Sequence, residues 1–304
     1  MTLIFETIYG SRAFGLDRPD SDTDLRGVFV APEAQYLGFV GGPEQVEPRD
    51  ETMWWELRKF LRLAAAGNPT ILEVLWTDAS HHRVVTAAGE RLLTARSLSL
   101  SKRIAGSFGE YAMSQLKRIR THRQWLLSPP TAAPRRADFG LPDRAVLSKD
   151  QMGAAGALLD AGRLAEADVT PNFLAVLDAE RRYKQARAHW TQFQTWQSKR
   201  NPARAALEAT HGYDTKHAQH LIRLLRMARE GLETGALTVL RLDRDELLAI
   251  RDGAWSYDEL IERAEALRNE IRALVSTSPL PATADEAALD ALCVSIAREV
   301  HRAA

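Results

Sequence analysis

The stretch that decides the fold is "ETIYGSRAFGLDRPDSDTDLRGVFVAP", residues 6–32, which places a Gly-Ser turn between two short apolar segments. Residues 3–9 and 22–30 are rich in Ile, Phe, Tyr, Leu and Val and are bounded by Gly, Pro and Asp, a pattern typical of strands. Gly10 and Ser11 end the first segment, where backbone N–H groups and a hydroxyl can bind the terminal phosphates of a nucleotide. The pattern predicts a strand, a phosphate-binding turn and a second strand.

Two aspartates open the second predicted strand. Side chains two residues apart share one face of a strand, so we expect the carboxylates of Asp22 and Asp24 to converge. Close carboxylates repel each other unless a cation lies between them. Mg²⁺ combines one or two carboxylates with substrate phosphates, and two such ions act on both oxygens of a phosphoryl transfer. The alternative is an ordinary turn in "PDSDTD", residues 19–24, where Asp side chains accept backbone hydrogen bonds.

Length, charge and cysteine content limit the class of protein. The 304 residues suffice for two domains. The 40 basic and 40 acidic residues cancel, so any contact with nucleic acid must come from local basic patches. Cys293 is the single cysteine, which excludes an intramolecular disulfide and a thiolate zinc cluster.

The N-terminal residues lack the pattern of a signal peptide, and no apolar run approaches the roughly 20 residues of a membrane span. We therefore expect a cytoplasmic protein without membrane contact.

The predicted secondary structure changes near residue 100, from strands and helices to helices alone. Before it, Glu51–Trp55 is a third predicted strand, followed by an amphipathic helix that ends at Gly67-Asn68-Pro69, and residues 70–76 fit either a helix or a strand. Beyond it, helices are predicted at 103–127, 148–163, 172–199, 215–230 and 257–275, with an irregular Pro-rich loop at about 128–147. The predicted class is α+β, with one domain at 1–100 and an all-α domain at 101–304.

The sequence resembles a known superfamily. Gly10-Ser11 followed by Asp22-Thr23-Asp24 is similar to the DNA polymerase β-like nucleotidyltransferases, in particular to their branch of predicted nucleotidyltransferases linked to RNA repair. The resemblance extends over "GSRAFGLDRPDSDTDLRGVFVAP" (10–32), "ELRKFLRLAAAGNPTILEVLW" (56–76) and "GYDTKHAQHLIRLLR" (212–226). It implies a small mixed sheet with helices and transfer of a nucleoside monophosphate from an NTP. The reaction would use two Mg²⁺ or Mn²⁺ ions and release pyrophosphate.

The resemblance also implies a third acid on a neighbouring strand. In this branch the acid lies four residues before the aromatic of an aromatic-x-Leu-x-Lys-Phe pattern, here residues 55–60, which points to Glu51. The adjacent Asp50 remains open, because strand alternation lets only one of the two face the metals. Asp22 and Asp24 would hold both ions, and Glu51 would bind the ion that activates the acceptor hydroxyl or accept its proton. Gly10, Ser11 and Arg12 would bind the nucleotide.

A second set of nucleotide-binding candidates lies in the third block. Lys216, His220 and Arg223 recur at i, i+4 and i+7 of a helix that starts at Asp214 or Thr215, which predicts one cationic stripe. A cation in a first helical turn opposes the helix dipole, so Lys216 is a candidate to bind the triphosphate. The alternative is an ordinary solvated face. Glu73 in the second block receives no role from the sequence.

Two basic stretches, Lys117–Arg136 and Arg181–Arg204, contain no acidic residue. The second also contains the aromatic residues Tyr183, Trp190, Phe193 and Trp196. Arginines interleaved with aromatic rings are typical of single-stranded nucleic-acid binding, whereas rings spaced by three are equally compatible with a helix face packed into a core. We expect core packing for most of the rings and phosphate contact for some arginines.

These observations favour a metal-dependent nucleotidyltransferase that acts on an NTP and an RNA end. One alternative is transfer to a hydroxyl of a protein or small molecule. Another is a nucleotide- or RNA-binding module without catalysis. The long helical part offers surface for a homodimer, and the sequence does not decide whether one forms.

Overall fold

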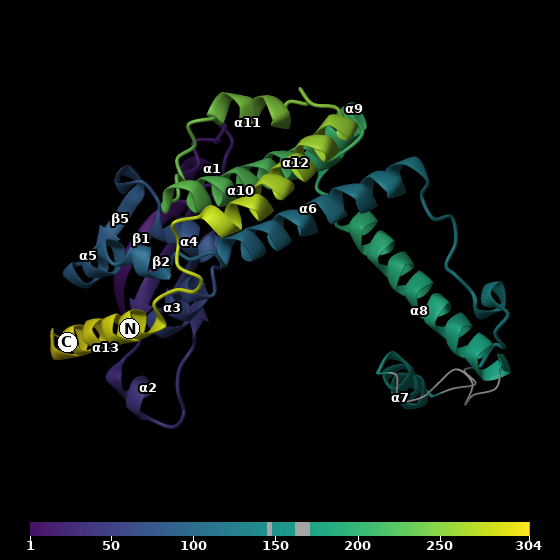
Figure 1. The fold of residues 1–304 in the computed structure, drawn as a ribbon, viewed down its shortest axis with the longest axis horizontal. Coiled ribbons are helices and arrows are strands. Elements are labelled where there is room, and N and C mark those ends of the chain that lie inside the picture. The colour runs from purple at the N-terminus through teal and green to yellow at the C-terminus, as the bar shows by residue number, and fades with distance from the viewer. Residues whose placement is uncertain (145–147, 162–170, 304) are drawn as a thin grey trace. The chain divides into compact units, whose positions relative to one another are not determined.

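A computed structural model describes residues 1–144, 148–161 and 171–303 (Figure 1). The chain divides into two compact units, one of Met1–Arg120 with Leu207–Ala304 and the other of Thr121–Ala206. The domain boundary expected at residue 100 therefore falls inside the first unit. The reason is that the C-terminal helices return to pack with the N-terminal part.

The first unit contains a five-stranded mixed sheet. Its strand order is β3-β4-β2-β1-β5, where β2 runs antiparallel to β1 and parallel to β4. The strands are β1 (Thr2–Tyr9), β2 (Asp24–Val30), β3 (Gln45–Val46), β4 (Thr52–Glu56) and β5 (His82–Val85). The three predicted strands are present with shifted ends, and the strand residues Ile4, Phe5 and Val28 are fully buried. The expected small mixed sheet is confirmed.

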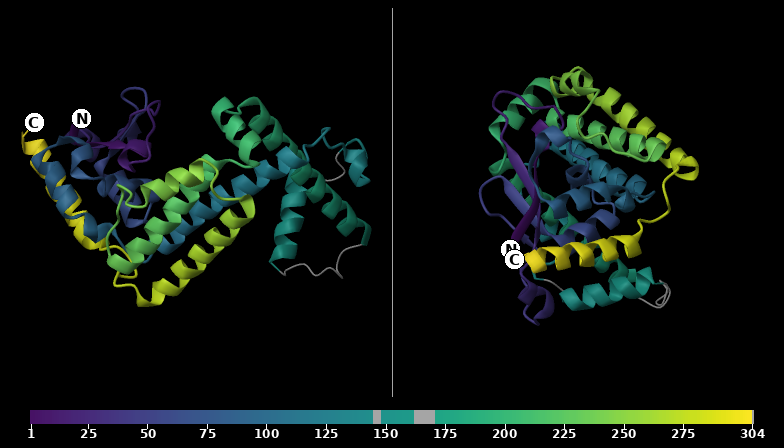
Figure 2. Two further views of the ribbon diagram at one scale, coloured as in Figure 1. Left: turned by 90° about the horizontal axis from the view of Figure 1, so that it is seen from above. Right: turned by 90° about the vertical axis from the view of Figure 1, so that its left-hand side faces the viewer.

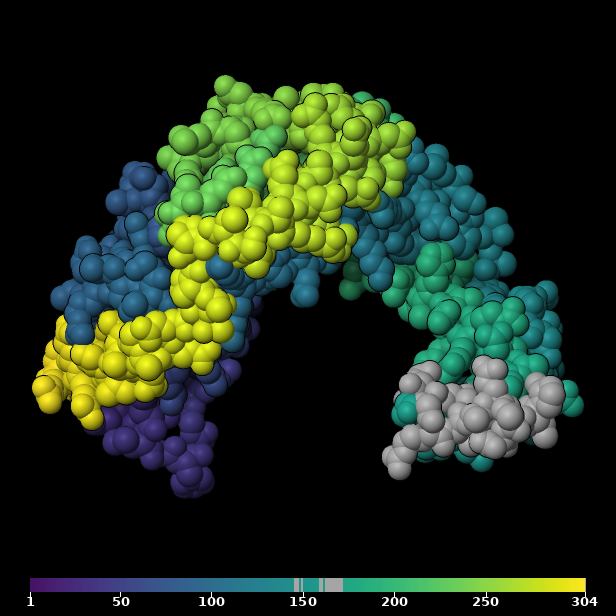
Figure 3. Space-filling view, in the orientation of Figure 1, coloured from purple at the N-terminus to yellow at the C-terminus, as the bar shows by residue number. Residues whose placement is uncertain are grey.

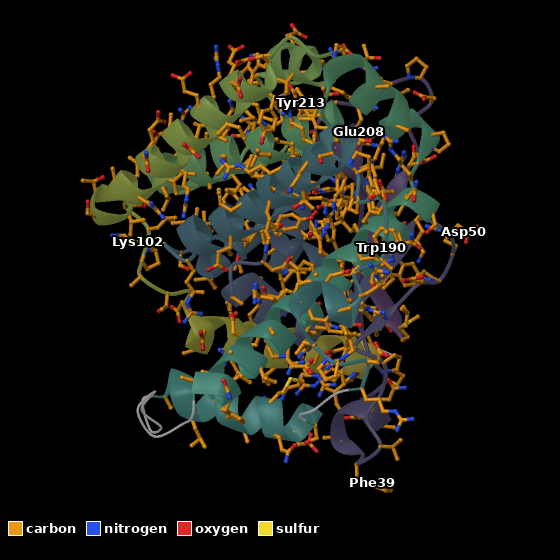
Figure 4. All side chains as sticks on the ribbon, turned by 90° about the vertical axis from the view of Figure 1, so that its right-hand side faces the viewer. Phe39, Asp50, Lys102, Trp190, Glu208 and Tyr213 are labelled. Atoms are coloured by element: carbon orange, nitrogen blue, oxygen red, sulfur yellow. The ribbon has the colours of Figure 1, made fainter. Side chains whose placement is uncertain are left out.

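Short helices follow the strands. They are α1 (Gly10–Ala13), α2 (Glu33–Leu37), α3 (Leu57–Ala65), α4 (Pro69–Leu75) and α5 (Ala87–Thr94), with the 3₁₀ turns η1 (Ala79–His81) and η2 (Arg96–Ser99). The stretch 70–76, which fitted either a helix or a strand, lies largely in α4. The sequence explains this start, because the side chain of Asn68 caps the N–H of Ile71 and Pro69 occupies the first helical turn. Beyond α2, Phe39 is fully exposed (Figure 4).

Further helices complete the first unit. They are α6 (Ile104–Leu127), which continues into the second unit, α9 (Pro202–His211), which begins in the second unit, α10 (Thr215–Thr234), α11 (Arg244–Arg251), α12 (Tyr257–Thr277) and α13 (Glu286–Ala303). Asp214 caps α10 by accepting a hydrogen bond from the N–H of His217 (3.0 Å), and the helix ends at Gly235 in a left-handed conformation. Helix α10 is buried along most of its length and packs against α11 and α12.

The C-terminal helix α13 returns to the N-terminal part of the chain. It packs against α3 and α5, so the two ends of the sequence share one unit. Figure 2 shows this helix in yellow beside blue segments, and Figure 3 shows its outer face at the molecular surface. The sequence patterns predicted neither α13 nor β5, α5, α9 and α11.

The second unit has its own aromatic core. It contains the end of α6, the 3₁₀ turn η3 (Arg136–Phe139), α7 (Lys149–Asp160) and α8 (Pro171–Ser198). Trp125 and Phe193 are 4% and 5% exposed, and the ring of Trp196 lies 5.3 Å from that of Trp125. Of the four rings of Arg181–Arg204, Phe193 is buried in the core, whereas Tyr183, Trp190 and Trp196 are half-buried, so the expectation of core packing for most of them is wrong. Parts of the predicted loop and of the predicted helix at 148–163 lie outside the described residues.

Within the described ranges, no helix combines the length and the apolar composition that a membrane span requires.

Candidate functional site

Gly10 of the Gly-Ser turn lies against Asp24, the acid that begins strand β2. Gly10 has a φ of +68°, in the left-handed region that favours glycine. A Cβ atom at this position would lie 2.4 Å from Oδ2 of Asp24, far inside van der Waals contact. Glycine is therefore required twice, by backbone conformation and by the closeness of the carboxylate. The predicted turn and the predicted acid meet at this point.

The turn is closed by its own backbone. The N–H of Phe14 donates to the carbonyl of Gly10 (3.2 Å), and the N–H of Leu16 donates to the carbonyl of Ser11 (2.8 Å). Ser11 is half-buried. These bonds fold residues 10–16 into a compact segment between β1 and the loop that carries Asp22.

Arg12 links the turn to that loop. Its Nη2 donates to the carbonyl of Ser21 (2.7 Å) and its Nε to the carbonyl of Asp22 (3.3 Å), while its Nη1 lies 3.5 Å from the carboxylate of Asp17. The sequence assigned Arg12 to the nucleotide. In the structure its guanidinium donates to backbone carbonyls of the loop that carries Asp22.

Arg26 provides a positive charge next to Asp24. Its Nη2 lies 3.2 Å from Oδ1 of Asp24, and its Nη1 donates to the backbone carbonyls of Leu25 (2.8 Å) and Glu51 (3.0 Å). The two charged side chains are 19% and 27% exposed. The sequence patterns gave Arg26 no role. The available signal was its spacing, because residues 24 and 26 share one face of β2.

Glu51 lies at the start of the neighbouring strand. Leu25 pairs with Thr52 in the parallel β2–β4 ladder, and the N–H of Leu25 donates to the carbonyl of Glu51 (2.9 Å), so Glu51 comes beside Asp24. Glu51 has a φ of 54°, which is uncommon for a residue other than glycine and recurs at functional sites. Both Glu51 and Asp50 are exposed, and Figure 4 shows Asp50 facing outward.

The acids have the chemistry of a divalent-cation site but are not gathered into one. Asp22 and Glu51 are exposed and Asp24 is half-buried. Carboxylate oxygens are the donors that Mg²⁺ and Mn²⁺ prefer. In the part of the chain that the structure describes, however, no three His, Cys, Asp or Glu side chains come together as a metal-binding group. The donor types fit the implied ions, and the contact between Gly10 and Asp24 fits a phosphate next to a metal ligand.

The predicted cationic stripe on α10 runs from the surface into the core. Lys216 is exposed, His220 is half-buried and Arg223 is 1% exposed. Nη1 of Arg223 lies 2.6 Å from Oε1 of Glu73 on α4, and both side chains are 2% exposed. This differs from the single cationic stripe predicted from the sequence, because Arg223 is buried against Glu73. Helical spacing places three residues on one side, but it does not reveal which element covers part of that side.

Glu73 also binds the residue that precedes the turn. The Oη of Tyr9 donates to Oε2 of Glu73 at 2.5 Å. Burial, followed by the adjacent negative charge of Glu73, holds the pKa of Tyr9 well above its usual value, so this phenol stays protonated. Sequence reasoning gave Glu73 no role, because its partner lies on a helix far along the chain.

A small mixed sheet in which a Gly-Ser turn packs on an Asp-x-Asp strand defines the polymerase β-like class of nucleotidyltransferase folds. Residues 1–127 match the family RlaP, described as an RNA repair pathway DNA polymerase beta family. The resemblance to the RNA-repair branch is thereby confirmed for this part of the chain. The block at 212–226 lies beyond the matched residues.

One curated relative matches part of the chain. The "Uncharacterized protein YcgL" of Bacillus subtilis (strain 168) is 32% identical over 90 residues, which cover 28% of this chain and 35% of the relative. The chain therefore spans about a third of the length of that relative. No solved structure matches the chain.

Proposed function

We propose that this protein is a metal-dependent nucleotidyltransferase that transfers a nucleoside monophosphate from an NTP to the hydroxyl of an RNA end. The observation that carries the proposal is the contact of Gly10 with the carboxylate of Asp24. It brings a phosphate-binding turn against an acid of the kind that holds catalytic metals. The family match of residues 1–127 supports the same class of reaction.

The chain's own residues have distinct roles in this proposal. Backbone N–H groups of the turn and the hydroxyl of Ser11 bind the triphosphate. Asp22 and Asp24 would hold Mg²⁺ or Mn²⁺, which when bound neutralises charge on the phosphate oxygens. Glu51 accepts the proton of the acceptor hydroxyl. The acceptor oxygen forms a bond to the α-phosphorus, the bond from that phosphorus to the bridging oxygen breaks, and pyrophosphate leaves.

The stretch Arg181–Arg204 is the proposed contact surface for RNA. It carries seven basic residues and no acid, and Lys184, Arg187 and Lys199 are exposed. Because Phe193 is buried in the core and the other three rings of the stretch are half-buried, the contact would depend on phosphate charge more than on base stacking. Such a surface binds RNA with strong salt dependence.

The proposal is tested with labelled NTPs offered to RNA and to a pool of proteins, in Mg²⁺ and in Mn²⁺. We expect label in RNA, and we expect the Asp22→Asn/Asp24→Asn variant to lose the transfer. Asp20→Asn is the matched control, because Asp20 is exposed in the same loop and has no proposed role. A double variant that consumes NTP at the wild-type rate refutes the site, and label in protein instead of RNA refutes the acceptor.

A second candidate function is a nucleotide- or RNA-binding module without catalysis. It is favoured by the fact that the acidic side chains do not form a three-ligand group among the described residues. Tight RNA binding by the wild-type protein with no transfer in either metal would support it over the first.

A further inference from the structure

A buried ion pair lies directly behind the Gly-Ser turn. Glu73 and Arg223 are each 1% exposed, come from α4 and α10, and approach to 2.6 Å. Burying two charges carries a desolvation penalty that their attraction repays only with good geometry and further hydrogen bonds. A pair of apolar side chains of similar volume would stabilise this position as well, so stability alone does not account for the charges.

Glu73 and Arg223 also contact the residues at the two ends of the turn. Tyr9 immediately precedes Gly10, and its hydroxyl donates to Oε2 of Glu73 (2.5 Å). Phe14 immediately follows Ala13, and the guanidinium of Arg223 lies 3.6 Å from the centre of its ring. Such a distance is typical of a strong cation–π contact. The charged pair therefore contacts the residue before α1 and the residue after it.

The pair also ties the turn to α10. Nη2 of Arg223 lies 3.1 Å from Nδ1 of His220, and Nη1 lies 3.1 Å from the sulfur of Met227. Lys216, the exposed member of the same helix, lies two turns before Arg223. The helix that carries the second set of candidate nucleotide contacts is thus fixed to the turn through one buried side chain.

We propose that Glu73 and Arg223 are positioning residues that hold the Gly10–Ala13 turn in its phosphate-binding conformation. This inference rests on the proposed function for its purpose, whereas the ordering of the turn is testable without any nucleotide. The pair acts through Tyr9 and Phe14 and contacts neither substrate nor metal. It gives Glu73 the role that the sequence left unassigned, and it moves Arg223 from the substrate to the support of the turn.

The variants that test this role must not leave one charge of the pair buried alone. Removing one member leaves an uncompensated buried charge, so single substitutions are expected to unfold the first unit. Glu73→Leu/Arg223→Met removes both charges at similar volume, together with the contacts to Tyr9 and Phe14. Tyr9→Phe removes the phenol hydroxyl alone and keeps the result interpretable if the double variant does not fold.

Hydrogen–deuterium exchange of residues 9–16 measures the ordering directly. The amides of Phe14, Gly15 and Leu16 are protected by the turn itself. We expect exchange there to rise about tenfold in the double variant, and to rise detectably in Tyr9→Phe, while β2 and α12 stay protected. A merely structural role would raise exchange throughout the unit, and unchanged exchange at 9–16 in the folded variants would overturn the inference.

The matched control is Arg136→Met/Glu180→Leu in the second unit, where the side chains of the pair are 14% and 4% exposed. It should leave exchange at 9–16 unchanged. Titration calorimetry with ATP, CTP, GTP and UTP in Mg²⁺ adds the functional readout. We expect the best-bound nucleotide to lose at least about tenfold in affinity in Glu73→Leu/Arg223→Met and nothing in the control.

The two proposals fail in different ways. A wild-type protein that binds none of the four nucleotides refutes the proposed function, while exchange at 9–16 still decides whether the pair orders the turn. Wild-type nucleotide affinity in the double variant refutes the positioning role and leaves the proposed function standing.

Discussion

Substitution of Gly10 by alanine separates the geometry of the candidate site from the stability of the fold. The position has a φ of +68°, and a left-handed conformation costs a non-glycine residue about 1–2 kcal/mol. We expect the free energy of unfolding to fall by about that amount. The clash with Asp24 adds little to it, because the touching atom is the end of a side chain that can rotate away.

The same rotation should disable the reaction. The new methyl group would lie 2.4 Å from Oδ2 of Asp24, whereas ordinary contact begins near 3.4 Å. The carboxylate must therefore move by about 1 Å, and a misplacement of that size can lower a catalysed rate by about 100-fold. Nucleotide transfer to RNA should fall by about this factor in kcat/KM.

Gly41→Ala is the matched control for backbone strain. Gly41 has a φ of +69°, and a Cβ there would meet no atom of the described residues within 4 Å. Urea unfolding of both variants should give similar losses of stability, while incorporation of labelled nucleotide falls in Gly10→Ala alone. Equal transfer rates in the two variants would show that the closeness of Gly10 to Asp24 has no catalytic meaning.

Three further predictions concern charges elsewhere in the chain. Burial alone would raise the pKa of Asp243, but hydrogen bonds led by Arg241 outweigh it and hold that pKa below its usual value. Asp243 therefore stabilises the fold above the ordinary Asp pKa of about 3.9, and this contribution is lost as the pH falls through the lower folded value. Urea unfolding of Asp243→Asn should lose less stability between about pH 5 and 2 than the wild type, and equal losses would contradict the reasoning. Burial raises the pKa of the Cys293 thiol to about 11. Iodoacetamide at about pH 8 should alkylate the native protein roughly 100-fold more slowly than the urea-unfolded protein by mass spectrometry, and equal rates would refute this burial. Lys184→Ala/Arg187→Ala should reduce the slope of log K against log salt for single-stranded RNA by about 1.4, whereas an unchanged slope would place the RNA elsewhere.

Local patterns predicted the parts of the fold that local forces determine. The strands that became β1 and β2 and the turn at Gly10 follow from apolar runs and glycine within one short segment. Strand β5 has four residues and forms by pairing with β1, about 80 positions earlier in the sequence, so its own composition carried little signal. Helix α13 was missed for a related reason. Its apolar face is defined by α3 and α5, which lie at the other end of the chain.

In the candidate site, too, contacts between sequence neighbours were predictable and contacts between distant residues were not. The closeness of Gly10 to Asp24 was predictable, because a turn and the next strand are neighbours in space and in sequence. The pairing of Arg223 with Glu73 was not, since 150 positions separate them and helical spacing does not identify a distant partner. A sequence gives the side of a helix on which a cation lies, but only the packing of helices decides whether that side faces water or a carboxylate.

The discontinuous first unit has a consequence during synthesis. When residues 1–120 have left the ribosome, the segment 207–304 that completes their unit has not yet been made. Arg223, the cation that pairs with Glu73, is synthesised 150 residues after it. At about 5–20 residues per second, that is a delay of roughly 8–30 s between the synthesis of the two members of the ion pair. Completion of the turn is in this way tied to the completion of most of the chain.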